Sequence, residues 1–293
     1  MNLALTVLEI VAPVFILAGT GFAWVRLGYE YRLQFVTRLA MTLAVPCLIF
    51  TALMKTELDP AALGNFLAAA IAGHLLIAVV FEAAVRIFGL DRQAILSPLV
   101  FGNTGNLGIP LAVFAFGEAG LGYAVVMLAV SSILIFTYGI QMVAGTGAGA
   151  KALKEPMIWA TLLGAVFMWQ GWQTPRFLTN ALDLIGQLAI PLMLLTLGVA
   201  IARLTPGKIS LAAMLSTVKF TVCAAAGCAV GWFFGLGHVA FGVLVLQFAT
   251  PAGVSTYLLA EKYEADADAV AGIVVVSTLM AVGVLPLLLA FLL

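Results

Sequence analysis

The chain has 293 residues, of which 64% are hydrophobic and only 9% are charged, and its 13 basic side chains balance 13 acidic ones. A water-soluble domain carries about 25% charged residues, so this chain lacks the polar side chains to cover a water-facing surface. The mean hydropathy of +1.18 indicates an integral membrane protein, and zero net charge leaves no basic face for nucleic acid, which we do not expect as a partner.

Taken in chain order, ten apolar segments approach or exceed the roughly 20 residues that a helix needs to cross the hydrocarbon. They are expected near 3–25, 33–54, 62–88, 93–117, 121–143, 156–172, 177–202, 209–235, 239–261 and 268–291. The fold class is therefore predicted as all-α and integral to the membrane. The first segment is expected to remain as a span, because no charged n-region and no small-residue cleavage site mark it as a signal peptide.

The basic side chains are unevenly distributed between the two sides of these spans. Only Lys55 and Arg176 fall on one side, and ten basic residues fall on the other. Because cytoplasmic loops carry the excess of Lys and Arg, both termini are predicted to lie outside. The residues placed on the cytoplasmic side are Arg26, Arg32, Arg38, Arg86, Arg92, Lys151, Lys154, Arg203, Lys208 and Lys262.

Two pairs of segments repeat at nearly one offset. RLAMTLAVPCLIFTAL aligns with DLIGQLAIPLMLLTLG at an offset of 145 residues, which places Pro46 on Pro191. EAGLGYAVVMLAVSS aligns with EADADAVAGIVVVST at an offset of 146, which places Ser131 on Ser277. Shared apolar composition is the alternative explanation, but two separated matches favour an internal repeat.

The repeat defines the expected domain organisation. A first five-helix repeat occupies 1–143, a cytoplasmic linker containing GTGAGAKALKE occupies 144–155, and a second five-helix repeat occupies 156–293. An odd number of helices forces the second copy to enter the membrane from the other side, so the two repeats are predicted to have inverted topology.

The fourth and ninth spans are each interrupted by Gly, Pro and small polar residues. The interruptions are FGNTGNLGIP, 101–110, and QFATPAGVSTY, 247–257. Unwound backbone in lipid leaves amide and carbonyl groups unpaired at several kcal/mol each, so such breaks persist only when buried in protein or lining a cavity. Half-helix N-termini suit an anion, and paired breaks indicate a transporter's substrate site. The alternative is that neighbouring helices simply satisfy the freed groups.

Four segments resemble the auxin efflux carrier family, which includes bacterial malate and malonate permeases and the plant auxin exporters. They are GNTGNLGIPLAVFAFGEAG with the ATPAG break, LAVPCLIFTAL and AIPLMLLTLGVAIA, and the resemblance covers essentially the whole chain. The plant exporters often read Leu-Pro-Asn at the fourth-span break, where Gly102 here replaces the Pro and Asn103 remains. They also carry a long loop between helices 5 and 6, whereas about ten residues stand there in this chain, so a small organic anion fits better than auxin.

The resemblance implies ten helices as two inverted five-helix repeats, in a fold like that of bile-acid transporters and Na+/H+ antiporters, with helices 4 and 9 broken and crossing. Helices 1, 2, 6 and 7 would form a scaffold that commonly dimerises. Helices 3–5 and 8–10 would form a moving transport domain. A homodimer in a bacterial inner membrane, in contact with lipid, is therefore expected.

The two breaks supply the candidate binding groups. The amides of Asn103 and Asn106 can donate to a carboxylate, although both could instead cap a half-helix or bond between helices. Glycines there let the backbone approach a ligand, and prolines hold the breaks open. The predicted substrate-binding residues are Asn103, Thr104, Gly105, Asn106, Gln247, Thr250, Gly253 and Ser255, and the predicted helix-breaking residues are Gly102, Pro110 and Pro251.

Two ionisable residues within spans are candidates for charge or proton coupling, because such residues are usually functional. Lys219 in the eighth span could attract the anion or bind a proton, or its stem could reach the interface. His74 in the third span could carry a proton or be a hydrogen-bonded structural residue. The histidines and cysteines show no metal-ligand spacing and no nucleophile has a base partner, so we expect no metal, no cofactor and no enzymatic activity.

The function predicted is a secondary active transporter, or a uniporter, of small organic anions. The substrate would bind where the broken helices cross, and an elevator-type movement of the transport domain would expose it alternately to the two sides. A cation or proton exchanger of the same fold, an anion channel and a non-transporting sensor remain alternatives. Substrate identity, direction and coupling ion stay open.

Overall fold

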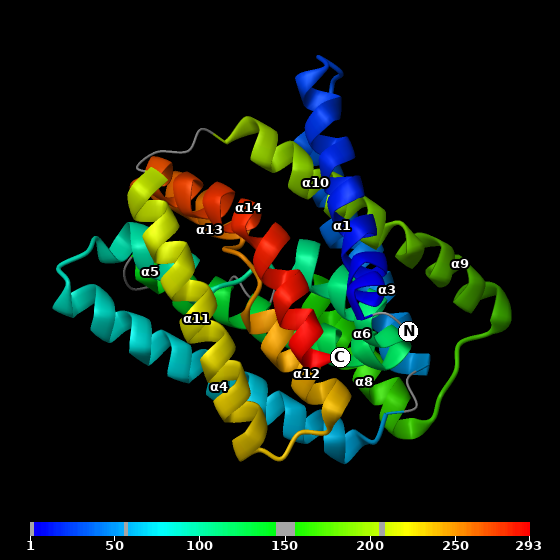
Figure 1. The fold of residues 1–293 in the computed structure, drawn as a ribbon. Helices are drawn as coiled ribbons and strands as arrows, with labels where there is room; N and C mark the ends of the chain where they lie inside the picture. The colour runs from blue at the N-terminus through cyan, green and yellow to red at the C-terminus, as the bar shows by residue number, and fades with distance from the viewer. Residues whose placement is uncertain (1–2, 56–57, 145–155, 205–208) are drawn as a thin grey trace.

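The computed structural model describes residues 3–55, 58–144, 156–204 and 209–293, and in these residues every regular element is a helix (Figure 1). The predicted all-α class is thereby confirmed. Of the predicted linker at 144–155, only Ala144 lies within the described residues.

The helices divide between the two halves of the sequence. The first half contains α1 (Leu3–Arg26), α2 (Leu33–Leu39), the π-helix η1 (Ala40–Ala44), α3 (Val45–Lys55), α4 (Pro60–Ile87), α5 (Arg92–Val100), η2 (Thr104–Gly108), α6 (Ile109–Leu134), η3 (Ile135–Gly139) and α7 (Ile140–Ala144). The second half contains α8 (Pro156–Gln170), α9 (Arg176–Gln187), α10 (Ala189–Arg203), α11 (Ile209–Phe233), α12 (His238–Phe248), α13 (Val254–Lys262) and α14 (Ala267–Leu292).

Seven helical stretches among the described residues are long and apolar enough to cross a membrane, which makes this a multi-pass membrane protein. They are Leu5–Arg26, Leu33–Lys55, Pro60–Ile87, Thr104–Val143, Arg176–Arg203, Ile209–Phe233 and Ala267–Leu292. The 40-residue stretch Thr104–Val143 joins parts that were expected as separate fourth and fifth spans. Gly117 has φ 62° and ψ −149° within it, a left-handed conformation that kinks the stretch and that glycine adopts without steric cost.

Aspartate caps fix where three of the helices begin. Asp59 accepts a hydrogen bond of 3.2 Å from the Ala61 amide at the start of α4, and Pro60 occupies the first helical turn, where its missing N–H costs nothing. Asp91 caps α5 through the Gln93 amide at 3.0 Å. Asp266 caps α14 in the same way, so each of these helices starts at a defined residue.

The helices pack as two groups. In one group, α1 packs on α10 and α3 packs on α8 and α9; in the other, α11 packs on α4, α12 and α14, and α12 packs on α6. In the first group, glycines allow α1 and α10 to approach each other closely. A Cβ on Gly198 of α10 would collide with the Ala18 carbonyl of α1, and a Cβ on Gly21 would collide with the Leu195 carbonyl.

The two groups meet at an apolar cluster beside the fourth-span break. Val14 of α1 and Leu197 of α10 are fully buried, and they belong to the same cluster as Leu107 and Leu111. Since Leu107 lies in η2 and Leu111 lies in the first turn of α6, the resumed part of the broken helix faces the other group of helices.

Candidate functional site

The helix breaks of the two halves lie against each other and are joined by hydrogen bonds. The backbone amide of Asn103 donates to the carbonyl oxygen of Pro251 at 2.7 Å, and the amide of Gly253 donates to the carbonyl oxygen of Phe101 at 3.1 Å. The bonds form an isolated antiparallel bridge between Gly102 and Ala252. Unwound backbone from two distant segments thus satisfies itself within the protein, as the membrane interior requires.

The bridge depends on glycine at two of its positions. A Cβ on Gly102 would collide with the hydroxyl oxygen of Thr250, and a Cβ on Gly253 would lie 3.0 Å from the carbonyl oxygen of Gly102. That separation is already at the limit for real Cβ atoms. The two segments of the bridge can therefore approach this closely only with glycine at positions 102 and 253.

Further hydrogen bonds satisfy other backbone groups around the breaks. The Ala252 amide donates to the hydroxyl oxygen of Ser277 on α14 at 3.0 Å. The Asn103 carbonyl oxygen accepts from the Leu107 amide at 3.2 Å and from the Gly108 amide at 3.0 Å, which opens the wide turn of η2. The sequence did not single out Ser277 as a site residue; its alignment with Ser131 in the internal repeat was the available signal.

Side-chain amides at the breaks carry buried polar atoms without a partner. Asn103 is 6% exposed and Gln247 is fully buried. Among the described residues, no hydrogen-bond partner exists for Nδ2 of Asn103 or for either amide atom of Gln247. A buried polar group left unpaired costs about 1–3 kcal/mol, and such groups in a native protein call for an explanation such as a bound ligand or water.

The amide of Gln247 lies directly over Gly108, where a Cβ would collide with it. Gln247 closes α12 before the ninth-span break, and Gly108 ends η2 after the fourth-span break. Polar groups from both halves therefore converge on one buried place.

The remaining predicted binding residues divide by exposure. Thr104 and Gly105 are buried in η2, and Asn106 is half-buried. The Thr250 hydroxyl donates to the Gln247 carbonyl oxygen at 2.7 Å, so it is occupied by its own helix end. Ser255 is exposed on α13.

The two predicted helix-breaking prolines have different positions. Pro251 lies within the bridge, where its carbonyl oxygen accepts from Asn103. Pro110 lies in the first turn of α6, after the helix has already resumed through η2. Its missing N–H is compatible with the adjacent π-helical turn.

Lys219 is fully buried in α11, so its side chain does not extend to the membrane surface. Its ammonium group donates to the carbonyl oxygen of Leu99 at 2.9 Å. Leu99 belongs to the last turn of α5, immediately before the fourth-span break. A cation at this position complements the negative end of the half-helix dipole.

His74 is buried in α4 with both ring nitrogens occupied. Nδ1 lies 2.8 Å from the Ala70 carbonyl oxygen, which can only accept, so Nδ1 carries a proton. Nε2 lies 3.1 Å from the Ser131 hydroxyl, which donates to it when the ring is neutral. The ring also packs edge-on against Phe248 at the end of α12, with centroids 4.9 Å apart. His74 is thus hydrogen-bonded and also adjacent to the ninth-span break.

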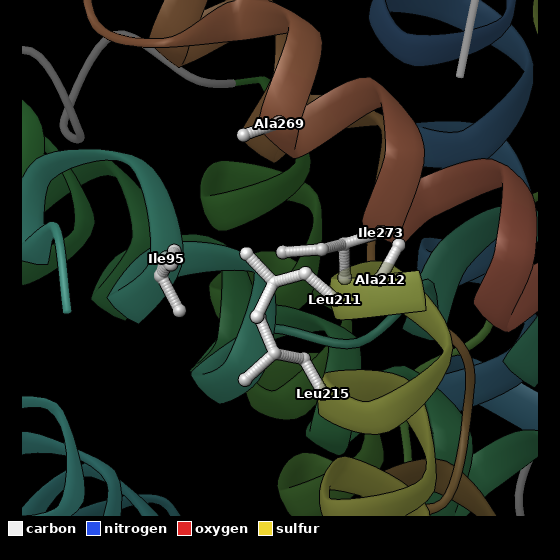
Figure 2. A pocket seen from close by; sticks show the side chains of 6 residues that line it. All are labelled: Ile95, Leu211, Ala212, Leu215, Ala269 and Ile273. Carbon is white, nitrogen blue, oxygen red and sulfur yellow. The ribbon is translucent and has the colours of Figure 1, made fainter. Parts of the chain in front are cut away.

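A small hollow between α5, α11 and α14 is too small for an organic anion. It holds about 10 Å³, roughly the space of one water molecule. Figure 2 shows its lining of Ile95, Leu211, Ala212, Leu215, Ala269 and Ile273, all of them apolar. This hollow is therefore not a candidate for the substrate site.

Within the described ranges, no group of three His, Cys, Asp or Glu side chains is placed to hold a metal ion. The polar atoms that converge on the bridge are amides, hydroxyls and backbone groups. Such groups can hydrogen-bond a carboxylate through their N–H and O–H donors, and their oxygens can also ligate a cation.

A protein family and two relatives resemble this chain over most or nearly all of its length. A family model described as membrane transport protein matches residues 6–156 and 148–289. A protein of Methanothermobacter thermautotrophicus named "Uncharacterized transporter" is 24% identical over 303 residues, covering 95% of this chain and 96% of the relative. "Uncharacterized transporter MJ1031" of Methanocaldococcus jannaschii is 25% identical over 191 residues, 61% of each protein.

Proposed function

The chain belongs to the auxin efflux carrier family of membrane transport proteins, and on this premise we propose that it is a secondary transporter, or a uniporter, of small organic anions. One observation carries the proposal. The two broken helices meet in a hydrogen-bonded bridge, and beside it the buried amides of Asn103 and Gln247 lack partners among the described residues. A carboxylate would supply acceptors for both.

The binding site is built from both halves of the chain. Asn103 Nδ2 and Gln247 Nε2 donate to the substrate carboxylate. The N-terminal turns of η2 and α13, which follow the breaks, contribute positive dipole character. Lys219 contacts the end of α5 through its hydrogen bond to the Leu99 carbonyl oxygen, and in its protonated form it would place a positive charge there.

The proposed topology is ten spans in two inverted five-helix repeats, 1–143 and 156–293. Two observations support it. The bridge pairs one break from each half. In addition, the helix is irregular shortly before each of the aligned prolines, with the π-helix η1 before Pro46 and the junction of α9 and α10 before Pro191. Equivalent irregularities at the 145-residue offset are what a repeat produces.

The two packing groups support the proposal of an elevator-type mechanism. The group containing α1, α3, α8, α9 and α10 would be the scaffold and the group containing α4, α6, α11, α12 and α14 the transport domain, with the proposed binding site in the latter. Leu107 and Leu111 lie at the boundary between the groups, so movement there would carry the site past the scaffold. We place the protein in a bacterial inner membrane with both termini outside, as a homodimer joined through the scaffold.

Coupling to protons would act through His74. Its ring is hydrogen-bonded to Ser131 and touches Phe248, next to the ninth-span break. Without coupling, the membrane potential alone is a sufficient driving force: one charge across 100 mV is worth about 2.3 kcal/mol, or roughly a fiftyfold gradient of a monoanion. The unpaired side-chain N–H groups of Asn103 and Gln247 favour an anion over a cation as the transported species.

The test is uptake into liposomes containing the purified protein. Radiolabelled malonate, malate, acetate and indole-3-acetate are supplied with and without a pH gradient, and the intact protein is compared with Asn103→Ala. We expect saturable uptake of at least one anion, stimulated by the same anion inside, and its loss in the variant. Asn65→Ala is the matched control, because Asn65 lies on α4 and bonds to the Phe234 carbonyl oxygen, away from the bridge.

Different outcomes separate the alternatives. Flux that does not saturate and is not stimulated from the opposite side would identify a channel, and binding without uptake would identify a sensor. Equal uptake by the intact protein and Asn103→Ala would remove Asn103 from the site. If no anion is taken up or bound under any gradient, the organic-anion proposal is wrong.

A further inference from the structure

A second hollow lies on the surface of the molecule, separate from the bridge. It is a groove of about 640 Å³ between α4 and the end of the fifth predicted span. Six side chains on one face of α4, from Leu75 to Arg86, form one wall, and Leu134 and Tyr138 form the other. Its α4 wall is apolar up to Glu82 and Arg86, so the groove has an apolar body and a charged end.

The charged end is built from Glu82 and two arginines that bind it. Glu82 accepts from Nε of Arg86 at 2.9 Å and from Nε of Arg92 at 2.9 Å. Arg92 also donates to the Met142 carbonyl oxygen at 3.3 Å, which fixes it against α7. Two guanidinium groups thus share one carboxylate. The side chain of Arg86 is 73% exposed, so its remaining donors are available to a further anion.

The dimensions of the groove match one leaflet of a bilayer. The α4 wall rises about 16 Å from Leu75 to Arg86 at 1.5 Å per residue, roughly half the hydrocarbon thickness of about 30 Å. Leu75 and Val79 are 56% and 67% exposed, which leaves the body of the groove open to lipid. The distribution of Lys and Arg predicts that the charged end lies on the cytoplasmic side, where anionic lipids concentrate.

We propose that this groove binds an anionic phospholipid, with one acyl chain along α4 and the phosphate group on Arg86. The apolar wall alone would accept any lipid chain. The exposed guanidinium of Arg86 adds the preference for a negatively charged headgroup, because a bidentate contact between Arg and phosphate is both strong and directional. Binding at this groove is independent of the substrate proposed for the bridge.

The test compares lipid retention by purified protein in detergent, measured by native mass spectrometry. The probes are dioleoyl phosphatidylglycerol and dioleoyl phosphatidylcholine, which share acyl chains and differ in headgroup charge. We expect one phosphatidylglycerol to be retained in preference to phosphatidylcholine. Arg86→Gln should lower its affinity about fivefold, which corresponds to the ~1 kcal/mol that one basic side chain contributes at an anionic surface. Arg26→Gln, at the end of α1, is the matched control.

A second pair of variants tests the apolar wall. Val79→Trp should fill the groove and reduce retention of phosphatidylglycerol, whereas Val80→Trp, at the next residue and outside the groove lining, should leave retention unchanged. Equal retention of the two lipids, or no effect of Arg86→Gln, would overturn the assignment of the headgroup. If millimolar inorganic phosphate displaces the bound phosphatidylglycerol and Val79→Trp does not change its retention, the groove binds free phosphate, and the proposal of lipid binding is wrong.

Discussion

His74 and Lys219 lie 145 residues apart, the offset that also relates Pro46 to Pro191, and each is buried against a broken helix of the other half. Lys219 of α11 donates to Leu99 at the end of α5. The His74 ring of α4 packs on Phe248 at the end of α12. This reciprocal placement is what the proposed inverted repeat requires, and it gives each break one ionisable side chain from the opposite half.

Substitutions at Lys219 separate its charge from its hydrogen bond. Lys219→Gln keeps a donor near the Leu99 carbonyl oxygen and removes the positive charge, so we expect the protein to remain folded while the KM for the anion rises about tenfold. Lys219→Ala also removes that donor and leaves the carbonyl oxygen only the weak contact with the Cys223 thiol at 3.9 Å, which should cost about 1–3 kcal/mol. Uptake kinetics and the melting temperature in detergent measure the two effects. An unchanged KM in Lys219→Gln would limit Lys219 to a structural role.

A methyl group at position 108 should displace the amide of Gln247. Gly108→Ala places a Cβ against that amide, and the flexible end of Gln247 can swing aside, so the fold should survive. Losing one donor to the substrate should raise KM about tenfold, equivalent to about 1.4 kcal/mol. Gly19→Ala is the control, because a Cβ on Gly19 meets nothing within 4 Å. Identical transport by both variants would exclude Gln247 from the site.

The aligned serines on the fifth and tenth predicted spans should differ in their contribution to stability. Ser277→Ala leaves the Ala252 amide of the bridge without an acceptor and should cost about 1–3 kcal/mol. Ser131→Ala removes the partner of His74 Nε2 and should cost about 1 kcal/mol, while shifting the pH dependence of uptake if His74 couples protons. Melting temperatures of the purified variants test whether Ser277→Ala is more destabilising than Ser131→Ala, and Ser210→Ala, at an exposed residue, is the control. Equal melting temperatures for all three variants would contradict the importance of the Ser277 contact.

Ionisation of Tyr31 should lower the stability of the folded protein at alkaline pH. Burial raises the pKa of its phenol, and the hydrogen bond to Thr196 and the charge of Arg203 partly offset this shift. Because the folded pKa exceeds the ordinary value near 10, the stabilisation is complete below pH 10 and is lost as the pH rises through the folded pKa.

Tyr31→Phe should remove that alkaline loss. It should also lower stability near neutral pH by about 1 kcal/mol, since the 2.9 Å hydrogen bond to Thr196 disappears. Melting temperatures at pH 7 and pH 11 test both statements. Parallel losses in the intact protein and the variant between these pH values would show that other groups control the alkaline transition.

The positions of the two breaks were predictable because Gly, Pro and small polar residues are conspicuous in otherwise apolar helices. FGNTGNLGIP contains the break at Phe101 to Asn103, and ATPAG contains the break before Val254. The pairing of these segments as an antiparallel bridge was not predictable, because it depends on how the two halves pack. For the same reason Ser277 was missed: its role exists only once α14 lies beside Ala252.

Local geometry accounts for other differences between expectation and structure. Thr250 was expected to offer its hydroxyl to a ligand, yet the Gln247 carbonyl oxygen three residues earlier is a nearer acceptor. The π-helices η1 and η3 left no trace in the sequence pattern, whereas η2 falls inside the predicted fourth-span break. A helix that is apolar on every side has no polar face whose period would reveal a widened turn.

The antiparallel bridge also constrains the order in which the chain is assembled. Phe101 and Asn103 leave the ribosome long before Pro251 and Gly253, the residues that satisfy their carbonyl and amide groups. Until then, the first half would have to hold two unpaired peptide groups away from lipid, at a cost of several kcal/mol. The fourth span is therefore expected to settle at its final depth only after the ninth has been synthesised, and neither half alone should form a stable membrane protein.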